Sequence, residues 1–140
     1  MIEVVAAIAV IAAIAVIGMF WLFRKPYTVE VDDLADYCFT LSANLWKIRR
    51  RLRQMGYEIN YPLQHIVKTK YGIQLIGARR VVNDHQYHIR VFRSEKGYRI
   101  YCHYEYTPEA RPWEHYVGEG YRIACEEAER VFEGFEVIKL

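Results

Sequence analysis

The feature that most constrains this chain is an uncharged apolar run near its N-terminus. Val4–Phe23 holds 20 residues without a charge, and as a helix this run measures about 30 Å, which matches the hydrocarbon core of a bilayer. Trp21 lies near its end, where aromatic side chains favour the membrane interface. Pro26 ends the helix because proline cannot continue the backbone hydrogen bonding. We therefore expect residues 1–25 to form a transmembrane anchor with its flanks.

The flanks of this run distinguish an anchor from its alternatives and give it an orientation. A cleaved signal peptide normally begins with a basic segment, whereas this chain carries Glu3 there. A buried core helix is disfavoured by the uniform apolarity of the run. Arg24 and Lys25 follow the run, and positively charged flanks tend to stay in the cytoplasm. We expect a single-pass membrane protein with its N-terminus outside and its C-terminal domain cytoplasmic.

Residues 32–140 are long enough for one compact domain, and residues 26–31 form a linker or a short strand before it. Asp32 or Asp33 can cap a first helix, and Gly56 stands where a C-cap glycine belongs. Apolar positions between them recur in steps of four and three residues, a heptad pattern. Such a stripe suits a helix that lies on a sheet, which we favour, or a coiled-coil dimer. Its members are Leu34, Cys38, Leu41, Leu45, Ile48, Leu52 and Met55.

Four β-like runs follow Pro62, each rich in Ile, Val, Tyr and Phe. Short turn signals separate them, and connections this short allow only antiparallel neighbours. A second amphipathic helix then ends near Glu133, and residues 135–140 form a last strand. The predicted fold class is α+β: a transmembrane helix and then a two-layer domain in the order helix, four-stranded antiparallel meander, helix, strand, with the helices on one sheet face. The four runs are Leu63–Lys70, Ile73–Val82, His85–Ser94 and Tyr98–Tyr106.

The three cysteines, Cys38, Cys102 and Cys125, are far apart and odd in number. Each falls on an apolar stripe of its predicted element, so we interpret all three as small buried hydrophobic residues without disulfide partners. Unpaired thiols agree with a reducing cytoplasm. Neither a Cys-x-x-Cys pair nor a pair of histidines at metal-ligand spacing occurs, so the sequence assigns no metal ligand, no cofactor and no catalytic residue.

A polar stripe crosses the last two strands of the meander. Alternate residues of a strand share a face, and the opposite parity, with Ile100 and Cys102, makes the better core face. The polar face can bind an anion or a partner, or use histidine as a general acid and base. The alternative, which we favour, is a solvated sheet face with cross-strand charge pairs. Its members are His88, Arg90, Arg99, Tyr101, His103 and Glu105.

The densest basic cluster lies in the first predicted helix, and the net charge of +2 conceals a polarised domain. Residues 47–99 carry 13 basic against three acidic residues, and residues 100–140 carry four against nine. The cluster can be a solvated helix end that suits the helix dipole. It can also contact an acidic protein surface or a second copy, anionic lipid, or nucleic-acid phosphates. Its members are Lys47, Arg49, Arg50, Arg51 and Arg53.

These observations favour a single-pass membrane-anchored domain that acts as a non-enzymatic protein-binding or assembly module. Its expected partners are membrane lipid and either another protein or a second copy of the chain. One alternative is a membrane-tethered binder of nucleic acid or anionic lipid that uses the basic helix. A second alternative is an enzyme whose histidine, arginine and tyrosine side chains act on the polar sheet face.

Overall fold

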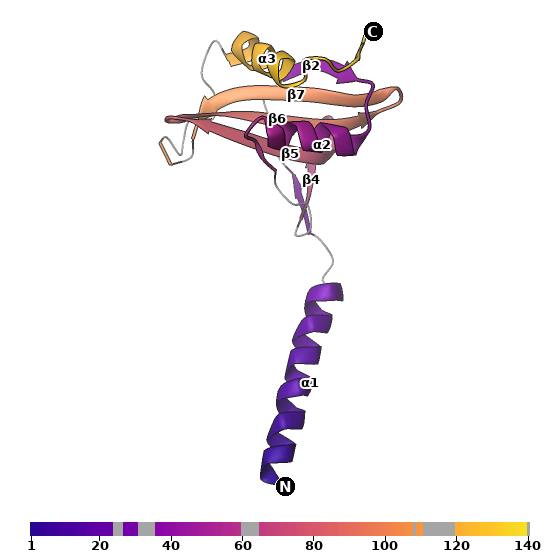
Figure 1. The fold of residues 1–140 in the computed structure, drawn as a ribbon, viewed down its shortest axis with the longest axis vertical. Coiled ribbons are helices and arrows are strands. Elements are labelled where there is room, and N and C mark those ends of the chain that lie inside the picture. The colour runs from indigo at the N-terminus through magenta and orange to yellow at the C-terminus, as the bar shows by residue number, and fades with distance from the viewer. Residues whose placement is uncertain (24–26, 31–35, 60–64, 108, 111–119, 140) are drawn as a thin grey trace.

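The computed structural model describes residues 1–23, 27–30, 36–59, 65–107, 109–110 and 120–139 (Figure 1). A long N-terminal helix precedes a domain built mainly from an antiparallel sheet with two shorter helices. In chain order the elements are α1 Ile2–Phe23, β1 Tyr27–Glu30, β2 Asp36–Leu41, α2 Leu45–Gln54, β3 Glu58–Ile59, β4 His65–Thr69, β5 Gly72–Val82, β6 His85–Ser94, β7 Gly97–Tyr106, α3 Gly120–Val131 and β8 Val137–Ile138.

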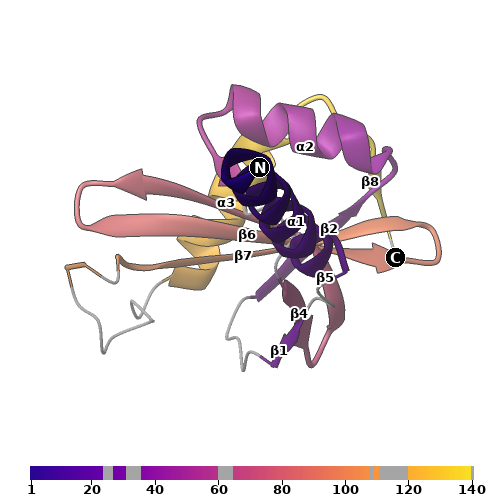
Figure 2. The same ribbon diagram turned by 90° about the horizontal axis from the view of Figure 1, so that it is seen from below.

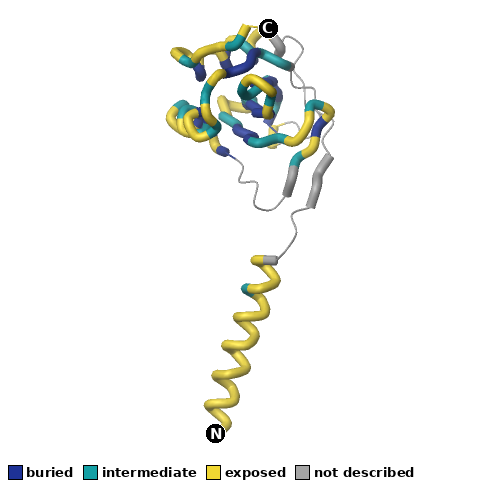
Figure 3. The backbone as a smooth tube through the Cα atoms, turned by 90° about the vertical axis from the view of Figure 1, so that its right-hand side faces the viewer, coloured by how far each residue is buried: buried dark blue, intermediate teal, exposed yellow. Residues whose placement is uncertain are grey.

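The N-terminal helix α1 makes no core with the rest of the chain. It is long and apolar enough to cross a membrane, which confirms the helix expected from Val4–Phe23. Every residue from Ile2 to Leu22 except Gly18 is exposed (Figure 3). An apolar surface of this size needs an apolar environment to cover it, and a bilayer provides one.

The sheet has the strand order β1-β4-β5-β6-β7-β2-β8, and β3 pairs with β5 outside this path. The antiparallel meander from β4 to β7 confirms the four predicted runs, and β1 joins it as a parallel neighbour of β4. Between β5 and β6, Asn83 adopts a φ of 58°. Asparagine tolerates this left-handed conformation, which the tight turns of β-hairpins require.

The predicted first helix is wrong over its first half. Asp36–Leu41 forms strand β2, which lies between β7 and β8, and α2 begins only at Leu45. Asn44 caps α2, because its side chain accepts a hydrogen bond of 2.9 Å from the backbone N–H of Lys47. Both edges of β2 find partners, so sheet pairing over a long sequence distance outweighs the local heptad pattern. The expected cap at Asp32 or Asp33 lies outside the described residues.

Both helices of the domain pack on one face of the sheet, as predicted. The side chains of Ile48 and Leu52 in α2 are fully buried, as are Ala124 and Ala128 in α3. All four belong to the same cluster as Ile89 and the other inward residues of the central strands. Figure 2 shows α2 on one side of strands β5–β7 and the β1–β4 pair on the other.

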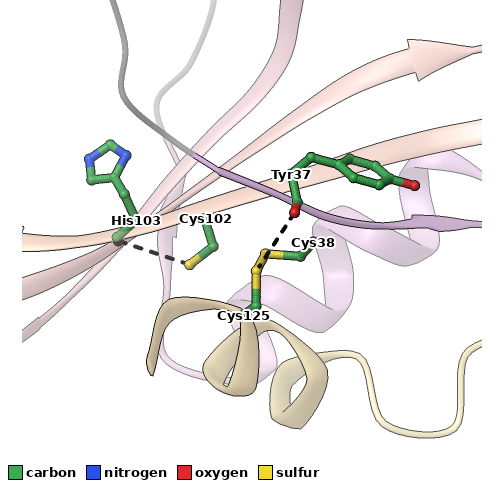
Figure 4. Close-up of a disulfide and its surroundings, with 5 residues drawn as sticks. All are labelled: Tyr37, Cys38, Cys102, His103 and Cys125. Carbon is green, nitrogen blue, oxygen red and sulfur yellow. Dashed lines mark hydrogen bonds between the residues drawn. A yellow bond between two sulfur atoms is a disulfide. The ribbon is translucent and has the colours of Figure 1, made fainter. Parts of the chain in front are cut away.

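The prediction that all three cysteines are unpaired is wrong for two of them. Cys38 of β2 and Cys125 of α3 form a disulfide that spans 87 residues of sequence, with their Cα atoms 5.3 Å apart (Figure 4). Because Cys38 lies on strand β2 rather than on the expected helix, it meets Cys125 where β2 runs beneath α3. Cys102 is a free, buried cysteine, as expected.

Candidate functional site

The face of β6 and β7 opposite the helices carries the predicted polar stripe. Four cross-strand pairs follow one another along it: Gln86 with Glu105, His88 with His103, Arg90 with Tyr101, and Phe92 with Arg99. The structure therefore brings all six predicted residues onto one surface. Figure 4 shows His103 and Cys102 pointing to opposite sides of β7, as the alternation along a strand requires.

This face is buried, so the expectation of a solvated sheet surface is wrong. Arg90 is only 8% exposed, and His103 and Glu105 are each 6% exposed. At one end the turn after β4 covers the face, because the ring of Tyr71 stacks on that of Tyr101 at 4.3 Å. Polar groups in such a place must be satisfied by specific partners, and their geometry therefore carries information about function.

Two of the predicted arginines hold the covering turn and the neighbouring strand. Arg99 donates a hydrogen bond of 2.8 Å from Nη2 to the carbonyl oxygen of Tyr71. Arg90 donates from Nη1 to Oε1 of Gln74 on β5. Together with the aromatic contacts of Tyr101, these bonds close one end of the face, so we assign these three residues a structural role.

The other end of the face holds a compact group of two imidazoles and one carboxylate. The rings of His88 and His103 lie 5.0 Å apart, edge to face, and Nε2 of His103 is 3.1 Å from Oε1 of Glu105. Gln86 donates a hydrogen bond of 2.6 Å to the same carboxylate oxygen. Burial and the nearby charge of Arg90 hold the pKa of His88 well below its usual value. Nitrogen and carboxylate donors of this kind can ligate a metal ion, a role that the sequence analysis did not assign.

The basic cluster of α2 divides into a structural part and an exposed part. Arg51 donates hydrogen bonds from Nη1 to the carbonyl oxygens of Val131 and Glu133, at 3.1 and 2.8 Å. It thereby satisfies carbonyl groups at the C-terminus of α3, where a cation is favourable. Arg49 is half-buried, whereas Lys47, Arg50 and Arg53 are exposed.

A shallow pocket of about 250 Å³ lies beside the exposed part of α2. Trp46 is 62% exposed, and the guanidinium of Arg50 lies 5.3 Å from the centre of its ring. The sequence analysis missed Trp46, although a tryptophan outside the apolar stripe was a usable signal. The pocket is lined by Trp46, Lys47, Arg50, Arg51, Gln54 and Phe135.

A buried carboxylate on α3, which was not among the predicted site residues, links this helix to β5 and to Tyr57, which follows α2. Glu127 accepts hydrogen bonds from Tyr57 at 2.9 Å, Arg80 at 2.7 Å and Arg130 at 2.8 Å. Burial alone would raise the pKa of Glu127, but these hydrogen bonds bring it below the ordinary value of a glutamate. The arrangement is a stabilising network rather than a site open to a ligand.

No family model, no curated protein and no solved structure matches this chain. The fold and its surfaces define it as an α+β domain with an N-terminal helix capable of spanning a membrane.

Proposed function

We propose that this chain is a membrane-anchored, non-enzymatic protein-binding or assembly module whose contact surface is the exposed side of α2. The observation that carries this proposal is Trp46, which is 62% exposed beside Arg50 at the pocket. Tryptophan and arginine are the residues that most often carry binding energy at protein interfaces. An exposed pair of this kind supports a docking role.

The size and charge of the pocket indicate what it accepts. Sites for small molecules and cofactors typically enclose about 300–1,000 Å³, so a pocket of about 250 Å³ suits a single side chain of a partner better than a cofactor. Lys47 and Arg50 line it with positive charge. Complementary potentials favour association, so the partner surface offers an apolar side chain flanked by carboxylates.

A second copy of the chain offers such a surface. Three carboxylates of the C-terminal region, those of Glu126, Glu129 and Glu133, are exposed, and Ile123 of α3 is 38% exposed. Glu126 pairs with Arg122 at 3.5 Å, which leaves Glu129 and Glu133 as the more available carboxylates. Contact between α2 of one copy and α3 of another would join two different surfaces, which generates rings or open chains. We therefore take self-assembly as the first form of the proposal to test.

Native mass spectrometry of the full-length protein, extracted from its own membranes in mild detergent, tests this proposal. We expect a defined complex, and we expect Trp46→Ala to weaken it about 30-fold, since loss of an interface hot spot costs about 2 kcal/mol. Val81→Ala is the matched control, because Val81 of β5 is an exposed apolar residue that does not line the pocket. Recovery of a lone 16.7 kDa monomer would contradict the proposal.

The orientation of the domain depends on two signals that disagree. Arg24 and Lys25 favour a cytoplasmic domain, whereas the disulfide between Cys38 and Cys125 favours an oxidising compartment. Two charges are a small bias, and the disulfide joins two packed elements of the domain. We propose that the domain lies on the oxidising side of the membrane, which reverses the orientation expected from the charges alone.

Treatment of intact cells with a protease tests this orientation. We expect the domain to be cleaved from outside, and we expect Cys38 and Cys125 to resist alkylation in denatured extracts until a reductant is added. Cys102 is the internal control, since it is free and should react as soon as the chain is denatured. A domain that resists the protease, and whose three cysteines all react before a reductant is added, would support the cytoplasmic orientation instead.

A further inference from the structure

We propose that His88, His103 and Glu105 form a binding site for a divalent transition-metal ion such as Zn²⁺. This inference does not depend on the proposed function, because it concerns the opposite side of the sheet from α2. It rests on how two neighbouring strands bring three metal-ligating side chains together inside the domain. One ligand atom from each residue lies within 4.8 Å of the other two.

The strand geometry explains why these three side chains converge. His88 and His103 are direct partners in the antiparallel pair of β6 and β7, and directly opposed side chains on one face are the closest neighbours in a sheet. Glu105 lies two residues beyond His103, so it points to the same face. The backbone therefore orders all three residues before any ion binds, which reduces the entropy lost on binding.

The distances are close to those of a metal site. Ligands about 2.0–2.1 Å from a tetrahedral Zn²⁺ lie about 3.4 Å from one another. Nε2 of His103 and Oε1 of Glu105 are already 3.1 Å apart. The remaining two separations, both to the ligand atom of His88, are no more than 4.8 Å, so binding requires only that this imidazole approach the other two ligands. Two histidines and one carboxylate form a ligand set that binds Zn²⁺ and leaves a fourth position for water or another ligand.

The surroundings of the three residues resemble the outer shell of a metal site. Gln86 is 5% exposed and orients the carboxylate of Glu105 through a hydrogen bond of 2.6 Å. Such outer partners hold metal ligands in place. Its other polar atom, Oε1, is buried and has no hydrogen-bond partner among the described residues. A water bound to the metal would be a suitable donor for this oxygen.

Positive charge near the site limits its affinity for a divalent cation. Arg79 of β5 lies directly opposite His88 in the strand register. Arg90 lies two residues beyond His88 on β6 and therefore on the same face. The guanidinium of Arg90 bonds to Gln74 on β5, on the side away from β7. Because two of the three ligands are imidazoles, we expect a site selective for ions that prefer imidazole, such as Zn²⁺, Co²⁺ and Ni²⁺, over Ca²⁺ and Mg²⁺.

The test is calorimetric titration of Zn²⁺ into the full-length protein in mild detergent, after treatment with a chelator. We expect one ion per chain and at least a 100-fold loss of affinity in His103→Ala and in Glu105→Gln. Gln86→Ala should weaken binding about 10-fold to 100-fold, the usual effect of removing an outer partner. His85→Ala is the matched control, since His85 lies on the same strand but contacts Tyr104 and Tyr106 instead.

A second readout identifies the ligands directly. With Co²⁺ in place of Zn²⁺, we expect visible absorption bands of a nitrogen and oxygen site, without the near-ultraviolet band of a thiolate ligand. Circular dichroism of each variant shows whether it has folded. If His103→Ala disturbs packing, Glu105→Gln still tests the site, because glutamine has nearly the same shape as glutamate. Absence of binding, or binding that persists in both His103→Ala and Glu105→Gln, would overturn the proposal and leave the three residues as a buried polar network.

Discussion

At the scale of single residues, Glu127 shows how a buried charge is used to join elements. Its carboxylate receives hydrogen bonds from Tyr57, which follows α2, from Arg80 of β5 and from Arg130 of α3 itself. Charge-assisted hydrogen bonds are about twice as strong as neutral ones, and loss of the carboxylate would leave the hydroxyl of Tyr57, which is only 4% exposed, without its acceptor. Glu127 therefore stabilises the position of α3 on the sheet.

This network makes the stability of the domain sensitive to acid. Folding lowers the pKa of Glu127. The carboxylate of Glu127 therefore binds a proton more tightly in the unfolded chain than in the folded one. As a result, the free energy of unfolding decreases as the pH falls through the pKa that Glu127 has in the folded state. We expect Glu127→Gln to reduce the free energy of unfolding by about 1–3 kcal/mol at pH 7 and to remove part of the loss of stability in acid. Denaturant unfolding of the full-length protein at pH 7 and pH 4 measures both effects.

Glu129→Gln is the control for this experiment, because Glu129 is exposed on the same helix. Exposed substitutions usually change stability by no more than about 0.5 kcal/mol. The role of Glu127 would be rejected if both variants unfolded at the same denaturant concentration and with the same dependence on pH. The groups that face Glu127, namely Tyr57, Tyr87, Arg80 and Arg130, keep their ordinary charge state across this pH range.

At the scale of elements, the position of β2 organises the domain. It pairs with β7 on one side and β8 on the other, and Cys38 joins it to α3. Its end lies directly against the turn between β6 and β7, because a Cβ atom at Gly97 would overlap the carbonyl oxygen of Leu41. The absence of a side chain at Gly97 therefore lets β2 approach.

Gly97→Ala tests how closely β2 must pack. We expect it to destabilise the fold by about 1–3 kcal/mol, the usual penalty for overpacking, because backbone rather than a flexible side chain must move. Lys96→Ala in the same turn is the control, since Lys96 is exposed and should change stability little. The comparison is made by thermal unfolding, and equal midpoints for the two variants would contradict this view of β2.

At the scale of the whole molecule, the chain separates its tasks among distinct surfaces. The apolar α1 stays outside the domain core, one face of the sheet carries α2 and α3, and the other carries the polar stripe, which the Tyr71 turn covers at one end. The charged side chains exposed on α2 are basic, whereas those exposed on α3 are two arginines and two glutamates. The basic surface of α2 supports assembly through that helix, while the histidine–glutamate group is enclosed within the domain.

The candidate site was predictable in part. The alternation of side chains along β6 and β7 was sufficient to place His88, His103 and Glu105 on one face, because strand parity is a local property. The burial of this face was not predictable, since it depends on contacts between distant segments. Tyr71, in the turn between β4 and β5, packs on Phe92 and Tyr101 at the opposite end of the face from the two histidines. The sequence also did not predict that Arg51 would be structural while other basic residues of α2 stay exposed. Arg51 donates to carbonyl oxygens that lie 80 and 82 residues away in the sequence.

The sequence by itself determined the apolar helix of Val4–Phe23, the four strands of the meander and their turns, because each depends on periodicity and turn residues within a short stretch of chain. Only the tertiary structure decided that Asp36–Leu41 is a strand, that Cys38 bonds Cys125, and that the polar face is enclosed. These features arise from contacts between distant segments, whose combined pairing and burial outweigh local preference.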